Sequence, residues 1–181
     1  MFDGKIIYEK RNLEFIMLKK MKADLYLNTI FDIDPVAMKE AGIKGFMFDI
    51  DNTLEPYHTG KPGEKTLAFF RELSEQGFNV GIISNAKMPR ALAFCEDVTP
   101  YWVAAAGKPL KKGYRQLASM MRLQPKEIAA VGDQLFTDIL GGNRFGCFTI
   151  YVKPIVDSEP AFVSFKRKLE KPFMRRFWLH C

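Results

Sequence analysis

Residues 45–54 read Gly-Phe-Met-Phe-Asp-Ile-Asp-Asn-Thr-Leu, an apolar run that stops abruptly at two acids. The run from Phe46 to Phe48 is typical of a buried strand in a parallel sheet. Asp49 and Asp51 follow at its carboxyl end, where open α/β sheets bind ligands. Two acids in such a place are costly unless positive charge lies beside them. The stretch therefore predicts a site for a divalent cation and a phosphoryl group.

Outward from this stretch, strand and helix patterns alternate along the chain. Short apolar runs predict strands at residues 45–50, 78–83, 102–105, 128–131 and 148–152. Apolar spacing and helix-end residues predict helices at residues 35–42, 64–76, 88–95, 111–121 and 135–144. Such alternation implies right-handed crossovers between parallel strands. We therefore expect an α/β fold, Rossmann-like, with three α/β/α layers around a central parallel sheet.

Length and composition favour a single soluble domain. The chain has 181 residues, of which 48% are hydrophobic and 27% charged. No apolar stretch approaches the roughly 20 residues that span a bilayer, and basic residues interrupt the region where a signal peptide would be apolar. The cysteines, Cys95, Cys147 and Cys181, show no metal-ligand spacing, and their odd number favours a reducing compartment. We therefore expect a cytoplasmic protein.

The net charge of +6 is unevenly distributed. Residues 35–160 carry 15 basic and 14 acidic groups, whereas residues 161–181 carry six basic groups and one acidic group. We therefore divide the chain into an amphipathic, basic N-terminal segment (1–34), a core that carries the acids (35–155) and a basic, aromatic C-terminal tail (156–181).

Polar side chains follow each predicted strand where it ends. Thr53 comes soon after the two acids, Ser84-Asn85 follows the second strand, and Lys108 lies just after the third. The fourth strand ends at Asp133, and Asp138 follows in the next helix. Because the carboxyl ends of parallel strands meet at one edge of a sheet, we expect these groups to converge.

This set of residues suits phosphoryl transfer. Asp49 can attack phosphorus and form an aspartyl-phosphate, while Asp51 protonates the leaving oxygen and then activates water. Mg²⁺ prefers carboxylate oxygens, which Asp49 and Asp133 would supply. Ser84 and Lys108 would hold the other phosphoryl oxygens, Lys108 as a point charge.

The same residues carry a family resemblance. Asp49-Ile-Asp-Asn-Thr53 resembles the DxDxT signature of the haloacid dehalogenase superfamily, and Ser84, Lys108 and residues 132–138 resemble its remaining motifs in order. The stretch from Ile33 onward is similar to the YqeG-type phosphatases of subclass III-A. These are bacterial relatives of the mitochondrial phosphatidylglycerophosphate phosphatase.

The resemblance implies a role for each residue. Asp49 would be the nucleophile and Asp51 the general acid and base; superfamily dehalogenases lack an acid at that position. Mg²⁺ would be held by Asp49, the backbone carbonyl of Asp51 and Asp133. Asp138 would reach the metal through water or orient Lys108. Ser84 and Lys108 would bind phosphate. Beside this resemblance, we expect Thr53 to contact the substrate and Asn85 to supply an extra amide donor.

The spacing of the motifs leaves no room for a cap domain. Thr53 and Ser84 are 31 positions apart, and Ser84 and Lys108 are 24 apart; predicted helices and strands fill both gaps. Only the loop Glu55–Gly63 could cover the site. An uncapped site is open to a phosphate carried on something large, such as a lipid, a protein or a nucleic acid.

The C-terminal tail favours the lipid. Residues 162–179 mix aromatic with basic side chains, as an interfacial segment at an anionic membrane requires, and residues 10–22 repeat the theme. A second interpretation is a helix that packs Phe165, Leu169 and Phe173 on the core and leaves its basic face solvated. Nucleic-acid binding is disfavoured, because the middle of the chain lacks a basic stripe.

We therefore expect a Mg²⁺-dependent phosphomonoesterase acting on phosphatidylglycerophosphate, with peripheral contact at the inner face of the membrane. Two alternatives stay open. One is a phosphatase of a soluble small phosphate or nucleotide. The other is a membrane- or protein-binding module with vestigial chemistry. The sequence makes no prediction of oligomeric state.

Overall fold

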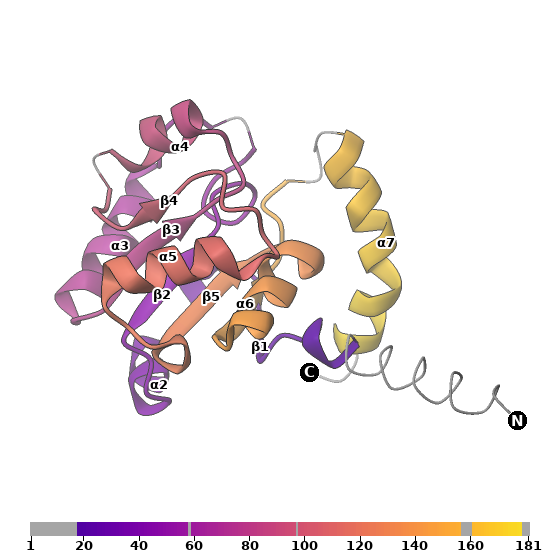
Figure 1. Cartoon of the computed structure of the whole chain (residues 1–181), viewed down its shortest axis with the longest axis horizontal. Helices are drawn as coiled ribbons and strands as arrows, with labels where there is room; N and C mark the ends of the chain where they lie inside the picture. The colour runs from indigo at the N-terminus through magenta and orange to yellow at the C-terminus, as the bar shows by residue number, and fades with distance from the viewer. Residues whose placement is uncertain (1–17, 58, 97, 157–160, 179–181) are drawn as a thin grey trace, which may run out of the picture.

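The computed structural model describes residues 18–57, 59–96, 98–156 and 161–178, without the side chains of residues 161–162 and 176–178. Within these ranges one sheet contains six strands, all parallel to their neighbours, in the order β1-β6-β5-β2-β3-β4 (Figure 1). The strands are β1 (Leu25–Leu27), β2 (Gly45–Phe48), β3 (Asn79–Ile83), β4 (Trp102–Val103), β5 (Ile128–Gly132) and β6 (Phe148–Val152).

Helices cover both faces of this sheet. They are α2 (Pro35–Glu40), α3 (Glu64–Glu75), α4 (Met88–Cys95), α5 (Lys111–Met121), α6 (Leu140–Phe145) and α7 (Ala161–Trp178). Short 3-10 helices occupy Ile30–Asp32 and Pro125–Glu127, and a π-helix occupies Leu135–Ile139. The predicted three-layer α/β/α architecture with a parallel sheet is confirmed.

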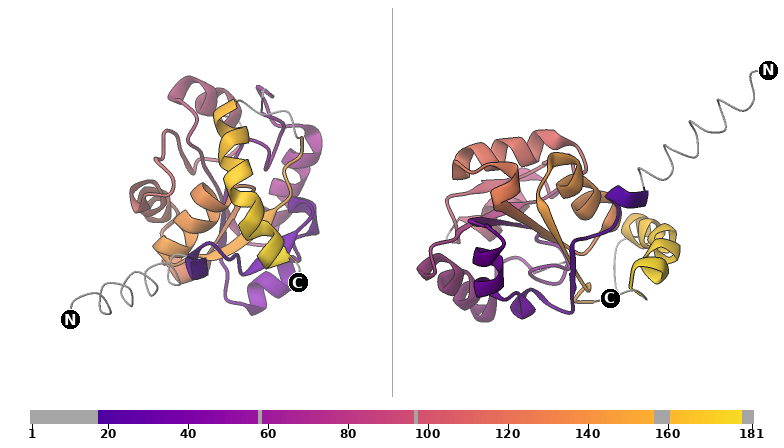
Figure 2. Two further views of the ribbon diagram at one scale, coloured as in Figure 1. Left: turned by 90° about the vertical axis from the view of Figure 1, so that its right-hand side faces the viewer. Right: turned by 90° about the horizontal axis from the view of Figure 1, so that it is seen from below.

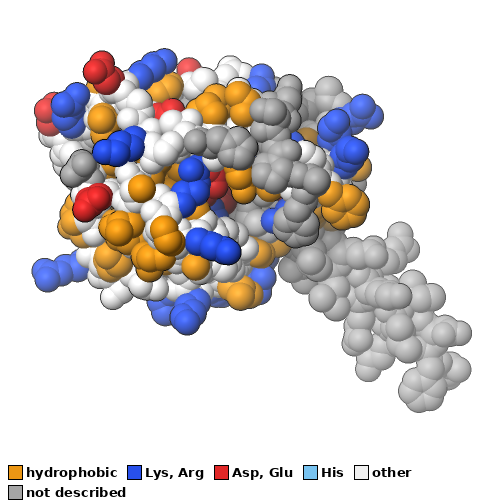
Figure 3. All heavy atoms as spheres, turned by 90° about the horizontal axis from the view of Figure 1, so that it is seen from above, with side chains coloured by type: hydrophobic (Ala, Val, Ile, Leu, Met, Phe, Trp, Pro, Cys, Tyr) orange, Lys and Arg blue, Asp and Glu red, His pale blue; other side chains and the backbone are white. Residues whose placement is uncertain are grey.

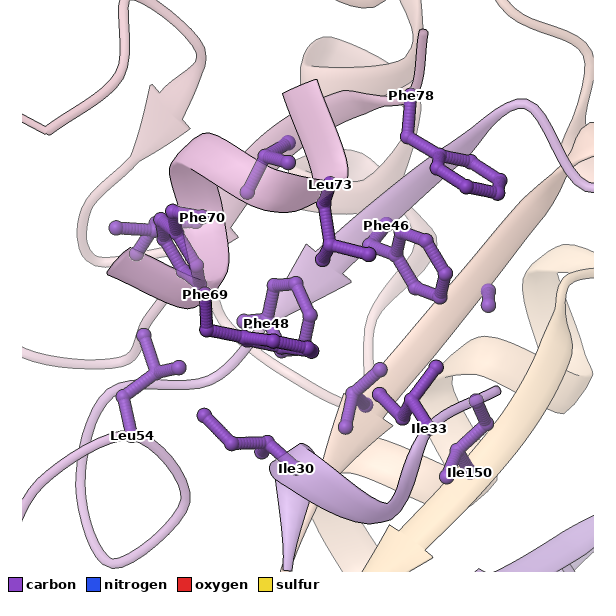
Figure 4. Close-up of a cluster of buried hydrophobic side chains, with 14 of the residues drawn as sticks. Ile30, Ile33, Phe46, Phe48, Leu54, Phe69, Phe70, Leu73, Phe78 and Ile150 are labelled. Atoms are coloured by element: carbon purple, nitrogen blue, oxygen red, sulfur yellow. The ribbon is translucent and has the colours of Figure 1, made fainter. Parts of the chain in front are cut away.

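The central strand β2 supplies the core on both faces by simple alternation. Phe46 and Phe48 point to the α3 side, where their rings pack on Phe70 and Phe78 (Figure 4). Met47 points to the other side, into the cluster formed with α5. All four residues of β2 are buried, as the continuous apolar run predicts. The two packed faces hold the strand rigidly, so the acids that follow it start from a fixed position.

Local signals explain the ends of the helices. The Asp34 carboxylate accepts a hydrogen bond from the Val36 N–H at 2.8 Å, and Pro35 begins α2. Gly42 and Gly77 follow α2 and α3 with φ of +80° and +90°, a region that favours glycine.

Two elements differ from the sequence prediction. The strand β1 was not predicted; it pairs with β6, Leu25 against Ile150, and adds an edge to the sheet from within residues 1–34. Three residues are too short a run for an apolar period to be visible. The helix predicted over 135–144 is a π-helix followed by α6. A π-turn so often marks a functional site that its position beside Asp133 is informative.

The long helix α7 lies against one side of the molecule, next to α6 and the π-helix (Figures 1 and 2). Phe173 packs there, with its ring 6.0 Å from that of Phe136, and this part of the packing prediction is confirmed. The same prediction was wrong for Phe165 and Leu169, which are 60% and 49% exposed. Residues 1–17 and the tail side chains of 162 and 177–179 lie outside the description, so the predictions made for them are untested.

In the described part of the chain, no helix has the length and apolar character needed to cross a membrane. Cys95 and Cys147 are free and buried. Cys181 lies outside the described residues.

Candidate active site

The polar residues predicted to converge do lie at the carboxyl edge of the sheet. Five of them line one cavity of about 510 Å³: Asp49, Asp51, Ser84, Asn85 and Lys108. Tyr57 from the loop 55–63 and Arg90 from α4 line it as well, and Val163 and Lys166 of α7 form part of its wall. In the view from above, acidic atoms lie near the middle of this face with basic side chains beside them (Figure 3).

Lys108 joins two of the acids. Its Nζ lies 2.6 Å from Oδ1 of Asp49 and 2.6 Å from Oδ1 of Asp138, and all three residues are buried. Burial alone would lower the pKa of Lys108, but the carboxylates of Asp138 and Asp49 outweigh it and raise that pKa. Burial raises the pKa of Asp49 well above its ordinary value, and Lys108 opposes this only in part. The lysine therefore stays charged, and Asp49 needs further positive charge to stay ionised.

Asn85 and Ser84 shape the phosphate side of the cavity. The Oδ1 of Asn85 accepts the backbone N–H of Lys108 at 2.8 Å, and its Nδ2 donates to the Lys108 carbonyl oxygen at 3.2 Å. The Ser84 hydroxyl oxygen accepts the N–H of Ala86 at 3.0 Å, which leaves the hydroxyl hydrogen for a ligand. Asn85 thus holds the chain that carries Lys108, a role beyond the extra donor expected of it.

Asp133 is fully buried between two partners. The Thr53 hydroxyl donates to its Oδ1 at 3.1 Å, and Nη2 of Arg167 donates to its Oδ2 at 2.5 Å. Burial raises the pKa of Asp133 to about 6, although Arg167 lowers it. Thr53 therefore contacts a metal-ligand candidate, and it is absent from the residues that line the cavity.

Three acids could hold a metal ion. Asp49, Asp133 and Asp138 each offer a carboxylate oxygen, and the three oxygens lie within 4.8 Å of one another. Against these three negative charges stand Lys108 and Arg167, and the raised pKa of Asp49 and of Asp133 shows that these cations do not fully offset the burial. A cluster of hard oxygen ligands with a deficit of positive charge fits a divalent cation.

Asp51 lies apart from this cluster and pairs with Arg90. The guanidinium of Arg90 also donates to the carbonyl oxygens of Tyr57 at 2.7 Å and Thr59 at 3.2 Å. It therefore ties the acid to the loop 55–63, the segment expected to cover the site. Arg90 was not predicted as a site residue; a basic residue in the first turn of the helix after Ser84-Asn85 was the available signal.

Two further partners of the site were missed because they lie in the tail. Arg167 and Glu170 were counted only as tail charges, yet they face inward from α7. Their three-residue spacing, in line with Met174 one turn later, was the signal.

The haloacid dehalogenase-like hydrolase family matches residues 55–146, which begin just after the Asp49–Thr53 motif. A protein from Bacillus subtilis (strain 168) named "Probable phosphatase YqeG" is 35% identical over 156 residues, covering 86% of this chain and 91% of that protein. This chain belongs to the haloacid dehalogenase-like hydrolase family.

More distant matches are found among proteins named as phosphatases. Phosphatidylglycerophosphate phosphatase 1, chloroplastic, of Chlamydomonas reinhardtii is 29% identical over 155 residues, covering 80% of this chain and 58% of that protein. The cobalt-bound deoxy-D-mannose-octulosonate 8-phosphate phosphatase of Haemophilus influenzae has a TM-score of 0.52 and 13% identity, over 77% of this chain and 91% of that one. At this identity the likeness concerns the fold alone.

The short motif spacing of this haloacid dehalogenase-like hydrolase agrees with the described residues, among which no inserted cap domain occurs. The expected superfamily, the phosphatase class and the fold without a cap domain are confirmed. Tyr57 of the loop 55–63 and two residues of α7 contribute to the wall of the cavity, together with α4 and the strand-end segments.

Proposed function

We propose that this hydrolase is a Mg²⁺-dependent phosphomonoesterase that works through an aspartyl-phosphate on Asp49. The observation that carries the proposal is that the two acids at the end of β2 have different surroundings. Asp49 is buried against Lys108 beside two further acids. Asp51 is half-buried in the cavity on Arg90. This difference supports an attacking role for Asp49 and a proton-transfer role for Asp51.

The proposed reaction has two halves. A carboxylate oxygen of Asp49 forms a bond to phosphorus while the ester P–O bond breaks, and Asp51 gives its proton to the leaving oxygen. Water then attacks the aspartyl-phosphate and passes a proton to Asp51, and the bond between phosphorus and Asp49 breaks. Inorganic phosphate leaves, and both acids return to their starting states.

Side chains of Asp49, Asp133 and Asp138, with the backbone carbonyl of Asp51, are the proposed metal ligands. When bound, Mg²⁺ supplies positive charge that screens the repulsion between the anionic nucleophile and the anionic substrate. Lys108 supplies a second, permanent charge beside Asp49. We propose that Ser84 and Lys108 bind the phosphoryl oxygens, that the second amide hydrogen of Asn85 donates to one of them, and that Thr53 orients Asp133.

A lipid phosphate is the substrate class that we favour, with phosphatidylglycerophosphate as the specific candidate. A curated relative carries that substrate in its name. The outer face of α7, made of Phe165, Lys168, Leu169 and Arg175, is exposed. Exposed apolar side chains set among basic ones suit an anionic bilayer. Val163 and Lys166 of the same helix line the cavity, so α7 would lie between a membrane on its outer face and the active site. We place the enzyme at the cytoplasmic face.

Phosphate release tests the proposal directly. The purified protein with Mg²⁺ is assayed on phosphatidylglycerophosphate in mixed micelles and on a panel of soluble phosphomonoesters and nucleotides. We expect the highest kcat/KM on the lipid, and a loss of at least about 10³-fold in Asp49→Asn. Asp51→Asn should cost about 10² to 10⁴-fold, the usual weight of a general acid.

Each other outcome has a defined meaning. A strong preference for soluble esters would leave the phosphatase and remove the lipid substrate. Activity that survives in Asp49→Asn would refute the aspartyl-phosphate. No turnover on the whole panel, with or without Mg²⁺, would favour a membrane- or protein-binding module with vestigial chemistry.

A further inference from the structure

One stripe of α7 faces the metal acids. Val163, Arg167, Glu170 and Met174 recur at intervals of four, three and four residues and so share a face of the helix. Glu170 is 2% exposed, and Met174 packs on the cluster that contains Leu135. If α7 packed on the core through apolar contacts alone, all four positions of this stripe would be apolar. Two charges are present, and each has a partner in the segment 133–138.

Arg167 grips Asp133 at two points. Its Nη2 donates to the carboxylate Oδ2 at 2.5 Å, and its Nη1 donates to the backbone carbonyl oxygen of the same residue at 3.1 Å. A planar guanidinium that donates to both the carboxylate and the backbone carbonyl of Asp133 fixes the orientation of that carboxylate. A point charge cannot do this. Thr53 occupies the other oxygen of the carboxylate. The Asp133 side chain is therefore held from both sides.

Glu170 holds the same segment three residues further on. Its Oε1 accepts the N–H of Phe136 at 2.8 Å. This N–H belongs to the first turn of the π-helix Leu135–Ile139, whose own N-cap residue, Gln134, provides no side-chain hydrogen bond. The π-helix carries Asp138, the partner of Lys108. Through Arg167 and Glu170, α7 thus contacts the chain between the two metal acids of this segment.

We propose that α7 braces the metal-binding segment 133–138 and that Arg167 is a positioning residue for the metal. The inference rests on the proposed metal site, in which Asp133 is a ligand. Partners that orient a metal ligand usually change metal affinity by about 10 to 100-fold when they are removed. The tail is then part of the catalytic apparatus: Arg167 serves the metal, while Lys168, Lys171 and Arg175 are exposed to solvent.

Metal binding by the full-length protein tests this without substrate. Binding of Mn²⁺ is followed by the loss of the free-ion electron paramagnetic resonance signal and is reversed by added Mg²⁺. We expect Arg167→Met to bind Mn²⁺ about 10 to 100-fold more weakly than the parent, and Arg167→Lys to fall between them. Lys171→Met removes an equal charge from an exposed position on the same helix and should bind as the parent does.

Several results would overturn the inference. They are an unchanged affinity in a folded Arg167→Met variant, an equal loss in Lys171→Met, or no Mn²⁺ binding by the parent. Tighter binding in Arg167→Met would mean that the guanidinium competes with the ion. If Arg167→Met does not fold, as thermal unfolding would reveal, Arg167→Gln takes its place and the same outcomes apply. A parent that binds Mn²⁺ but hydrolyses no phosphomonoester would refute the proposed function. The Mn²⁺ affinity of Arg167→Met would still test whether Arg167 positions the metal ligand.

Discussion

Gly132 ends β5 immediately before Asp133, and its missing side chain leaves room for Asp138. A Cβ at this position would lie 2.4 Å from Cβ and Cγ of Asp138, closer than carbon atoms approach. Gly132→Ala should therefore push Asp138 away from Lys108. We expect a loss of about 1 to 3 kcal/mol in the free energy of unfolding, typical of overpacking, together with a fall in phosphatase activity.

Urea unfolding and phosphate release measure both effects. Gly60→Ala is the matched control, because nothing lies within 4 Å of a Cβ added there. A Gly132→Ala variant with the stability and activity of the parent would show that Asp138 can move without consequence for the site.

At the scale of residues, the strand-end acids and Lys108 could be predicted, and the arginines that pair with Asp51 and Asp133 could not. Asp49, Asp133 and Lys108 follow apolar runs, so the edge they share is visible in the sequence. Asn85 lines the cavity, and it also holds the backbone of Lys108, a contact across 23 positions that no local pattern records. Arg90 was missed for the same reason.

Among the elements, the buried strands and amphipathic helices were predictable because burial imposes a period on the sequence. The helix α5 was predicted over the residues it occupies, 111–121. The three residues of β1 were too few for any period. The π-helix looks like an ordinary helix in the sequence, since its first turn is satisfied by Glu170 from a distant element.

The buried Glu170 of α7 makes the stability of the folded protein depend on pH. Burial raises the pKa of Glu170 from 4.5 to about 7, because the bonds to backbone N–H groups and the nearby Arg167 only partly oppose it. The protonated form therefore favours the folded state. This contribution is fully present below pH 4.5 and is lost as the pH rises through about 7.

Glu170→Gln removes the titration and keeps a carbonyl oxygen that can accept the Phe136 N–H. We expect the stability of the variant relative to the parent to increase between pH 5 and pH 8, by on the order of 1 to 3 kcal/mol. Urea unfolding at four pH values across this window measures the difference. A difference that stays constant with pH would mean that Glu170 remains ionised in the folded protein.

At the scale of the whole molecule, the motif spacing correctly predicted the absence of a cap domain. The arrangement of the tail was beyond the sequence, because two interpretations used the same aromatic and basic residues. The structure divides the apolar side chains of the tail between two environments. Phe173 and Met174 pack on the core, while Phe165 and Leu169 remain exposed. Arg167 points inward and pairs with the buried Asp133. This orientation of α7 leaves Phe165 and Leu169 on the side of the helix that faces solvent.

If the outer face of α7 enters an anionic membrane, Phe165 and Leu169 leave water together. Burying their exposed parts is worth about 2 kcal/mol, or on the order of 30-fold in affinity. The variant Phe165→Ser/Leu169→Ser should therefore bind vesicles rich in anionic lipid about 10 to 100-fold more weakly, as sedimentation with the vesicles would measure.

Val36→Ser/Leu110→Ser is the matched control, since these side chains are 63% and 58% exposed elsewhere on the protein. Equal losses in both double variants would point to a nonspecific effect of surface polarity. Unchanged binding by the α7 variant would remove the membrane from this face, while Arg167 on the opposite face would keep its proposed role in the metal site.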